Sequence, residues 1–170
     1  MAAETQLYIS DKRIVIIEKI IAILLVLWGL FCLYYIVTVA AGMINSVPKN
    51  LGGANYWYVL QVNHLSVILS ILCVFGGFML LFSDKSGWML SVVSSIMYCI
   101  SFFISSRSNT ADTDPYAIFY KSYGITAILF LIISVVLFLK PFRQKYLPSG
   151  KTYLWLISLL MLLVIDKIIF

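Results

Sequence analysis

Two long apolar segments, residues 57–82 and 87–105, follow one another across a short polar turn, Ser83 to Ser86. At about 1.5 Å of rise per residue, helices of these lengths approach or exceed the roughly 30 Å hydrocarbon core of a bilayer. Backbone groups inside lipid have no water to pair with, so a spanning segment must satisfy them within a helix. The two segments therefore predict an antiparallel transmembrane hairpin, because so short a turn makes the helices neighbours.

The composition of the whole chain is typical of an integral membrane protein. Hydrophobic residues make up 62% of the 170 residues and charged residues 11%, whereas soluble domains are about half apolar and about a quarter charged. The predicted fold class is an all-α integral membrane protein, a bundle of about five transmembrane helices around the central antiparallel hairpin. We expect a single domain over residues 1–170, with helices at residues 11–43, 57–82, 87–105, 115–140 and 150–170.

The distribution of Lys and Arg predicts the orientation of this bundle, because cytoplasmic loops of membrane proteins are enriched in basic residues. Five helices place the two termini on opposite sides. We expect the N-terminus in the cytoplasm and the C-terminus outside, in a plasma or inner membrane. Of the 12 basic residues, eight then lie inside (Lys12, Arg13, Lys19, Lys85, Lys140, Arg143, Lys145 and Lys151) and four lie outside (Lys49, Arg107, Lys121 and Lys167).

Small and polar residues recur at alternating spacings of three and four along both helices of the hairpin. Such stripes let membrane helices approach closely and form hydrogen bonds between them. We expect the Asn63 and Ser70 face of the first helix to pack on the Ser91 and Ser94 face of the second. A polar translocation path is the alternative interpretation. The candidate packing residues are Ser66, Ser70, Gly77, Ser91 and Ser94.

The best candidate for a polar intramembrane site is the group of Gln61, Asn63 and His64 near the start of the second predicted helix. Polar side chains at this depth usually face the interior of the bundle or a water-filled cavity. His64 is the single histidine of the chain. Its plainer interpretation is a hydrogen-bonding group between two helices.

Two acidic residues are expected close to the membrane boundary. Glu18 lies early in the first helix, where nearby Arg13 and Lys19 favour a solvated or paired carboxylate. Asp166 lies near the outer end of the last helix and needs a cation or a hydrogen-bond donor. Lys121, at the outer end of the fourth helix, is the expected partner of Asp166, and this ion pair would fix the last helix against the fourth.

The sequence contains no recognisable catalytic, metal or cofactor motif. Its three cysteines, Cys32, Cys73 and Cys99, each fall inside an expected helix without a CxxC pair, so we expect free thiols and no metal site. One histidine excludes bis-histidine haem ligation within one chain. The net charge of +5 comes from short loops beside apolar helices, which disfavours nucleic-acid binding. We therefore expect no enzyme activity and no cofactor.

Two hypotheses for the function remain. The first is a non-catalytic accessory or structural subunit, whose partners are membrane lipids and other integral membrane proteins or a second copy of itself. The alternative is a small solute or ion transporter or channel protomer, with its polar site on the second helix. The short loops and the apolar last helix favour the first hypothesis. Gln61, Asn63 and His64 beside a serine-rich helix favour the second.

Overall fold

The computed structural model describes residues 2–46, 61, 63–107 and 117–169, with side chains described at 12–42, 61, 63–106 and 123–168. Within these ranges every regular element is a helix, and no strand is present. The elements, which follow the chain in order, are α1 (Ala2–Ser46), α3 (His64–Leu81), α4 (Lys85–Arg107), α5 (Ala117–Phe138), α6 (Lys140–Tyr146) and α7 (Gly150–Ile169).

The all-helical class is thereby confirmed for the described residues, but several boundaries differ from those expected. Helix α1 is 45 residues long and extends beyond the expected 11–43 at both ends. The expected starts of two helices, at 57 and 115, lie outside the described residues. The expected helix 115–140 is interrupted near Lys140, because Leu139 adopts an extended conformation and Pro141 begins a new helix, α6. A proline is tolerated in the first turn of a helix but not in its interior.

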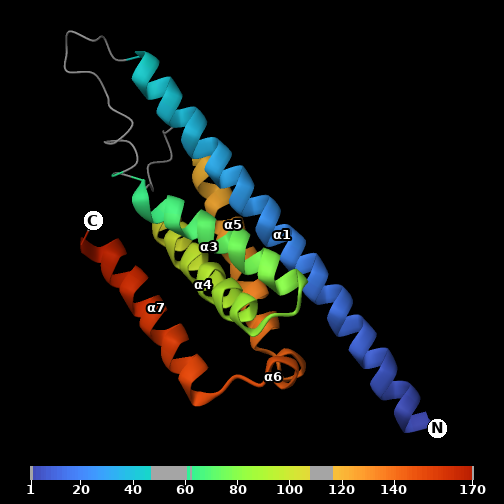
Figure 1. The fold of residues 1–170 in the computed structure, drawn as a ribbon. Coiled ribbons are helices and arrows are strands. Elements are labelled where there is room, and N and C mark those ends of the chain that lie inside the picture. The colour runs from blue at the N-terminus through green and yellow to red at the C-terminus, as the bar shows by residue number, and fades with distance from the viewer. Residues whose placement is uncertain (1, 47–60, 62, 108–116, 170) are drawn as a thin grey trace.

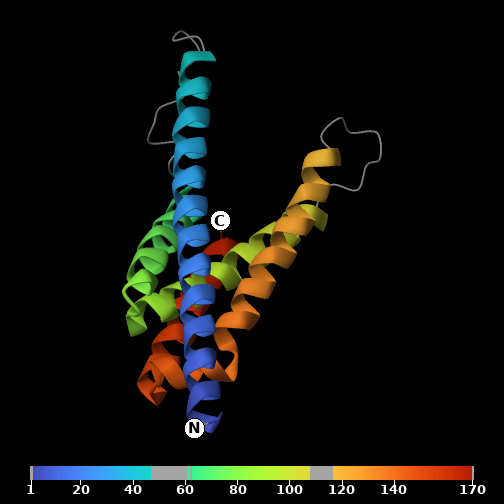
Figure 2. The same ribbon diagram turned by 90° about the vertical axis from the view of Figure 1, so that its right-hand side faces the viewer.

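The hairpin of α3 and α4 lies at the centre of the bundle (Figure 1). Helix α1 packs along α3, whereas α5 and α7 pack against α4, and α7 also contacts α3. Figure 2 shows that α1 and α5 are inclined to each other, with the C-terminal end of α1 and the N-terminal end of α5 far apart. The central hairpin thus separates α1 from α7 and carries helices on both sides.

Three described helical stretches are long and apolar enough to cross a membrane: Lys12–Gly42, His64–Leu81 and Lys85–Ser106. A fourth is added if Tyr123–Phe138 and Lys140–Tyr146, which meet at 58°, form one broken span. Five spans are therefore not confirmed. Helix α7 is in neither count, and its described turns carry three charged residues, Lys151, Asp166 and Lys167.

Glycines bring α1 and α3 into close contact. A Cβ atom added at Gly29 would lie 2.7 Å from the Ser70 carbonyl oxygen, and one at Gly77 would lie 2.7 Å from the Ala22 carbonyl oxygen. Gly77 therefore faces α1, although the sequence placed it on one face with Ser70 towards α4. The glycine that approaches α4 is Gly76, whose added Cβ would lie 2.9 Å from the Ser91 nitrogen. Helix α3 has neighbours on two sides, so its small residues serve two interfaces.

The remaining candidate packing residues are distributed over α3 and α4. Ser70, Ser91 and Ser94 are buried, whereas Ser66 is exposed. The Ser70 hydroxyl donates to the Ser66 carbonyl at 2.7 Å and accepts from the Tyr98 hydroxyl at 3.0 Å. The Ser70–Tyr98 bond is thus a polar link between α3 and α4, where hydrogen bonds between membrane helices contribute to association.

Candidate functional site

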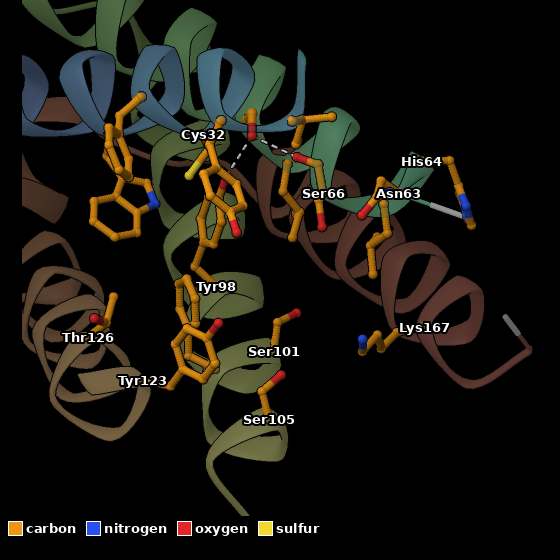
Figure 3. A pocket seen from close by; sticks show the side chains of 18 of the residues that line it. Cys32, Asn63, His64, Ser66, Tyr98, Ser101, Ser105, Tyr123, Thr126 and Lys167 are labelled. Atoms are coloured by element: carbon orange, nitrogen blue, oxygen red, sulfur yellow. Dashed lines mark hydrogen bonds between the residues drawn. The ribbon is translucent and has the colours of Figure 1, made fainter. Parts of the chain in front are cut away.

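A cavity of about 590 Å³ opens between α1, α3, α4, α5 and α7. Figure 3 shows Asn63, His64 and Lys167 at one side of it, with Tyr98, Ser101, Ser105 and Tyr123 across from them. Small-molecule sites are typically about 300–1,000 Å³, so the cavity has the size of a ligand site. It is lined by Trp28, Phe31, Cys32, Tyr35, Ile36, Asn63, His64, Leu65, Ser66, Leu69, Ser70, Tyr98, Ser101, Phe102, Ser105, Tyr123, Thr126, Asp166 and Lys167.

His64 and Asp166 form the polar contact at the rim of this cavity. His64 Nε2 lies 2.9 Å and 3.1 Å from the two carboxylate oxygens of Asp166. His64 Nδ1 lies 2.7 Å from the backbone carbonyl oxygen of Gln61, to which it donates. A carbonyl oxygen only accepts, so Nδ1 is the donor of this bond. The Nε2 contact joins α3 to α7 at the rim of the cavity.

The predicted polar residues take different positions relative to the cavity. Asn63 and His64 line the cavity, whereas the exposed Gln61 takes part through its backbone carbonyl. Asp166 contacts His64 of α3. The expected ion pair between Lys121 and Asp166 stays a prediction, because the side chain of Lys121 lies outside the described residues. For Asp166 the observed partner comes from the second predicted helix, not the fourth.

Aromatic side chains of α1, α4 and α5 line part of the cavity, and Phe130, which is not a lining residue, packs against them. The rings of Tyr98 and Phe130 stack with centroids 4.9 Å apart, and those of Phe102 and Tyr123 stack at 5.6 Å. The indole of Trp28 meets the Phe130 ring edge-on at 5.5 Å. Sequence reasoning missed the parts played by α1 and α5, because the small-residue pattern that marked the hairpin does not mark aromatic residues.

Two polar atoms of cavity-lining residues are buried without a hydrogen-bond partner among the described residues: Trp28 Nε1 and Ser101 Oγ. A buried donor left unpaired costs about 1–3 kcal/mol. Ser91 Oγ and Ser95 Oγ are also buried without a hydrogen-bond partner among the described residues, but neither residue lines the cavity. A molecule in the cavity that offers hydrogen-bond acceptors would therefore remove an energetic cost at Trp28 and Ser101.

A second polar cluster lies near α6 and the α3–α4 turn, centred on the carboxylate of Glu18, which is 1% exposed. Glu18 accepts hydrogen bonds from Ser83 Oγ at 2.9 Å and from the Tyr146 hydroxyl at 2.5 Å, and it pairs with Lys145 Nζ. Arg13 and Lys19, the cations near Glu18 in the sequence, are both exposed. This cluster joins α1, the α3–α4 turn and α6, which the sequence did not indicate.

The described side chains include no group of three or more His, Cys, Asp or Glu residues that could hold a metal ion. All three cysteines are free thiols. The carboxylates of Asp166 and Glu18 are each engaged in a separate cluster, one with His64 and the other with Lys145. The chemistry that the cavity itself offers is hydrogen bonding and charge at its rim and apolar contact at its aromatic wall.

Comparisons with known proteins found no relative of this chain. A scan against protein-family models, a search of curated proteins and a search of solved structures each returned no match.

Proposed function

We propose that this chain is a non-catalytic membrane protein that binds a small molecule in the cavity between α1, α3, α4, α5 and α7, as the binding site of a carrier. The observation that carries the proposal is the His64–Asp166 contact at the rim of a cavity whose lining contains the unpaired polar atoms of Trp28 and Ser101. This proposal develops the transporter hypothesis and places it ahead of the accessory-subunit hypothesis.

Energetic considerations support a ligand site at this position. Ionisable groups within a membrane bundle are costly and commonly mark substrate or ion pathways. The side chains of His64 and Asp166 are 30% and 23% exposed, so a molecule in the cavity can reach them. They come from helices 102 residues apart in the chain. Binding pockets typically combine an apolar lining with a few convergent polar groups, as this cavity does.

Asp166→Asn should reduce the amount of small molecule that the purified protein retains by several fold. The amide is nearly isosteric, but it loses the charge that holds His64 and orients the rim of the cavity. The measurement is mass spectrometry of small molecules extracted from the protein after purification in mild detergent. Asp84→Asn is the matched control, because among the described residues the Asp84 carboxylate accepts from the Ser86 nitrogen alone, at 3.1 Å, in the α3–α4 turn. Equal retention by both variants would contradict a ligand site at His64 and Asp166.

The accessory-subunit hypothesis remains the second candidate, and the exposed apolar surface of α7 favours it. Leu154, Trp155 and Leu162 are each more than 60% exposed, and the main contacts of α7 among the described helices are with α4 and α3. Such a surface fits membrane lipids, another membrane protein or a second copy of the chain. The same purification separates the candidates, because stoichiometric recovery of other proteins together with the absence of any small molecule would favour the accessory subunit.

We also propose that α7 is a fifth span, with the N-terminus in the cytoplasm and the C-terminus outside. The eight-to-four distribution of basic residues supports this orientation. A cysteine replacing the exposed Arg143 of α6 should be protected from an impermeant maleimide in intact cells and should react after the membrane is opened. Labelling of that cysteine from outside intact cells would reverse the proposed orientation. A cysteine at the exposed Ile168 should show the opposite behaviour if α7 spans.

A further inference from the structure

We infer that the ligand of the cavity is a single-chain lipid with an anionic head group and a carbonyl group next to its acyl chain. This inference rests on the proposed function, since it names the ligand class of the same site. It is carried by three observations: the lysine at the rim, the unpaired donors beside the cavity, and the position of the charged lining residues at one end of it.

A lysine stands beside the His64–Asp166 contact at the rim of the cavity. Lys167 is exposed and adjacent in sequence to Asp166. Its ammonium group supplies a positive charge at the rim. In Figure 3 its amino group is directed towards the side of the cavity lined by Ser101 and Ser105. An anionic head group, rich in acceptor oxygens, complements this rim.

The unpaired donors require acceptors on the ligand. The indole N–H of Trp28 can only donate, and the Ser101 hydroxyl can donate as well as accept. Neither polar atom has a partner among the described residues. An ester or amide carbonyl can accept from Trp28, while a head-group oxygen can accept from Ser101. A plain hydrocarbon would leave both groups unpaired.

The charged residues of the lining, like the head group of a membrane lipid, gather at one end of the cavity. Asp166 and Lys167 lie in the last turns of α7, at the partly exposed end of the cavity. Trp28 lies near the middle of the candidate span Lys12–Gly42, where the lining includes Phe31 and Phe102. A single acyl chain suits this deeper part, because the volume of about 590 Å³ lies within the range of small-molecule sites.

The test uses the full-length protein in uncharged detergent, titrated with a lysophospholipid that has a phosphoglycerol head group and bromine atoms on its acyl chain. Bromine quenches tryptophan fluorescence on contact, so Trp28 should show a saturable loss of emission. Trp28→Phe should remove that saturable component while leaving the quenching of the other tryptophans. Lys167→Gln should raise the half-saturating concentration about tenfold, as expected for the loss of a charge-assisted contact. Ser101→Ala should raise it by a few fold.

Two matched controls separate the site from general effects. Lys151→Gln removes an exposed lysine at the other end of α7, and Ser106→Ala removes a hydroxyl that bonds to the Phe103 carbonyl of its own helix. Both should bind like the wild type. The absence of a saturable component that depends on Trp28 would overturn the inference. So would equal displacement of the brominated lipid by glycerol 3-phosphate, which would show a site for a soluble phosphate. If either occurs while Asp166→Asn still loses a retained small molecule, the proposed function stands and the ligand class is wrong.

Discussion

Lys145→Met should lower the free energy of unfolding by about 3–5 kcal/mol, the range expected when one partner of a buried ion pair is removed. The reason is that the substitution leaves the buried carboxylate of Glu18 without its cation. Glu18 is 1% exposed, and without Lys145 the donors left to its carboxylate in the described part of the chain are the Ser83 and Tyr146 hydroxyls. Unfolding in mixed micelles with a denaturing detergent, followed by circular dichroism, would measure the loss.

A substitution of the other partner, Glu18, should lower the free energy of unfolding by less. In Glu18→Gln the amide oxygen can still accept from Tyr146, and the Lys145 side chain, 27% exposed, can move its ammonium towards water. We therefore expect a loss of about 1–3 kcal/mol, typical of an impaired buried hydrogen-bond group. We therefore also predict that Lys145→Met loses more stability than Glu18→Gln, because Glu18 is the more deeply buried partner.

Lys140→Met is the matched control, since Lys140 is an exposed lysine of the same short helix, α6. It should change the free energy of unfolding by less than about 0.5 kcal/mol, as surface substitutions usually do. The double variant Glu18→Met with Lys145→Met should recover much of the stability that Lys145→Met loses, because no buried charge remains. If Lys145→Met is as stable as Lys140→Met, the Glu18 cluster does not hold α6 to α1.

Gly87→Ala should also destabilise the bundle strongly, because the added methyl group would collide with backbone and not with a flexible side chain. Its Cβ atom would lie 2.4 Å from the Leu80 nitrogen and 2.5 Å from the Met79 carbonyl carbon. The two helices of the hairpin would have to separate. We expect a loss near the upper end of the range of about 1–3 kcal/mol that overpacking causes in protein cores.

The control for Gly87 is Gly124→Ala on α5, where an added Cβ atom meets nothing within 4 Å. Alanine is favoured over glycine in a helix interior by roughly 0.5–1 kcal/mol, so this variant should be unchanged or slightly more stable. Thermal unfolding in detergent, read by size-exclusion chromatography, compares the two. Equal melting temperatures for both variants would contradict the close contact between α3 and α4 at Gly87.

Much of the fold followed from the sequence alone. The apolar segments predicted the helices α3 and α4 and their short connection, because the cost of unpaired backbone groups in lipid leaves few alternatives. The small-residue stripes predicted close helix packing, but they do not say which neighbour each residue meets. Gly77 illustrates the limit, since its spacing from Ser70 suits a single face, yet Ala22 of α1 is what it contacts.

The sequence indicated some residues of the candidate site and gave no sign of others. Asn63 and His64 were identified because polar residues are rare in apolar helices, whereas Trp28 resembles any other aromatic residue of a membrane helix. The interruption between α5 and α6 was signalled by Pro141, which was interpreted as the end of a helix and not as the start of a new one. Local rules of this kind act over one or two turns of helix, so they detect single elements well.

The sequence by itself predicted the all-helical class of the described elements and the polar positions that need partners. Only the tertiary structure decided those partners: Lys145 for Glu18, 127 residues away, and His64 for Asp166, 102 residues away. The physical reason is that a contact between helices depends on their order, tilt and rotation about their axes. Those quantities are set by the packing of all the helices together, and the periodicity of any one segment does not contain them.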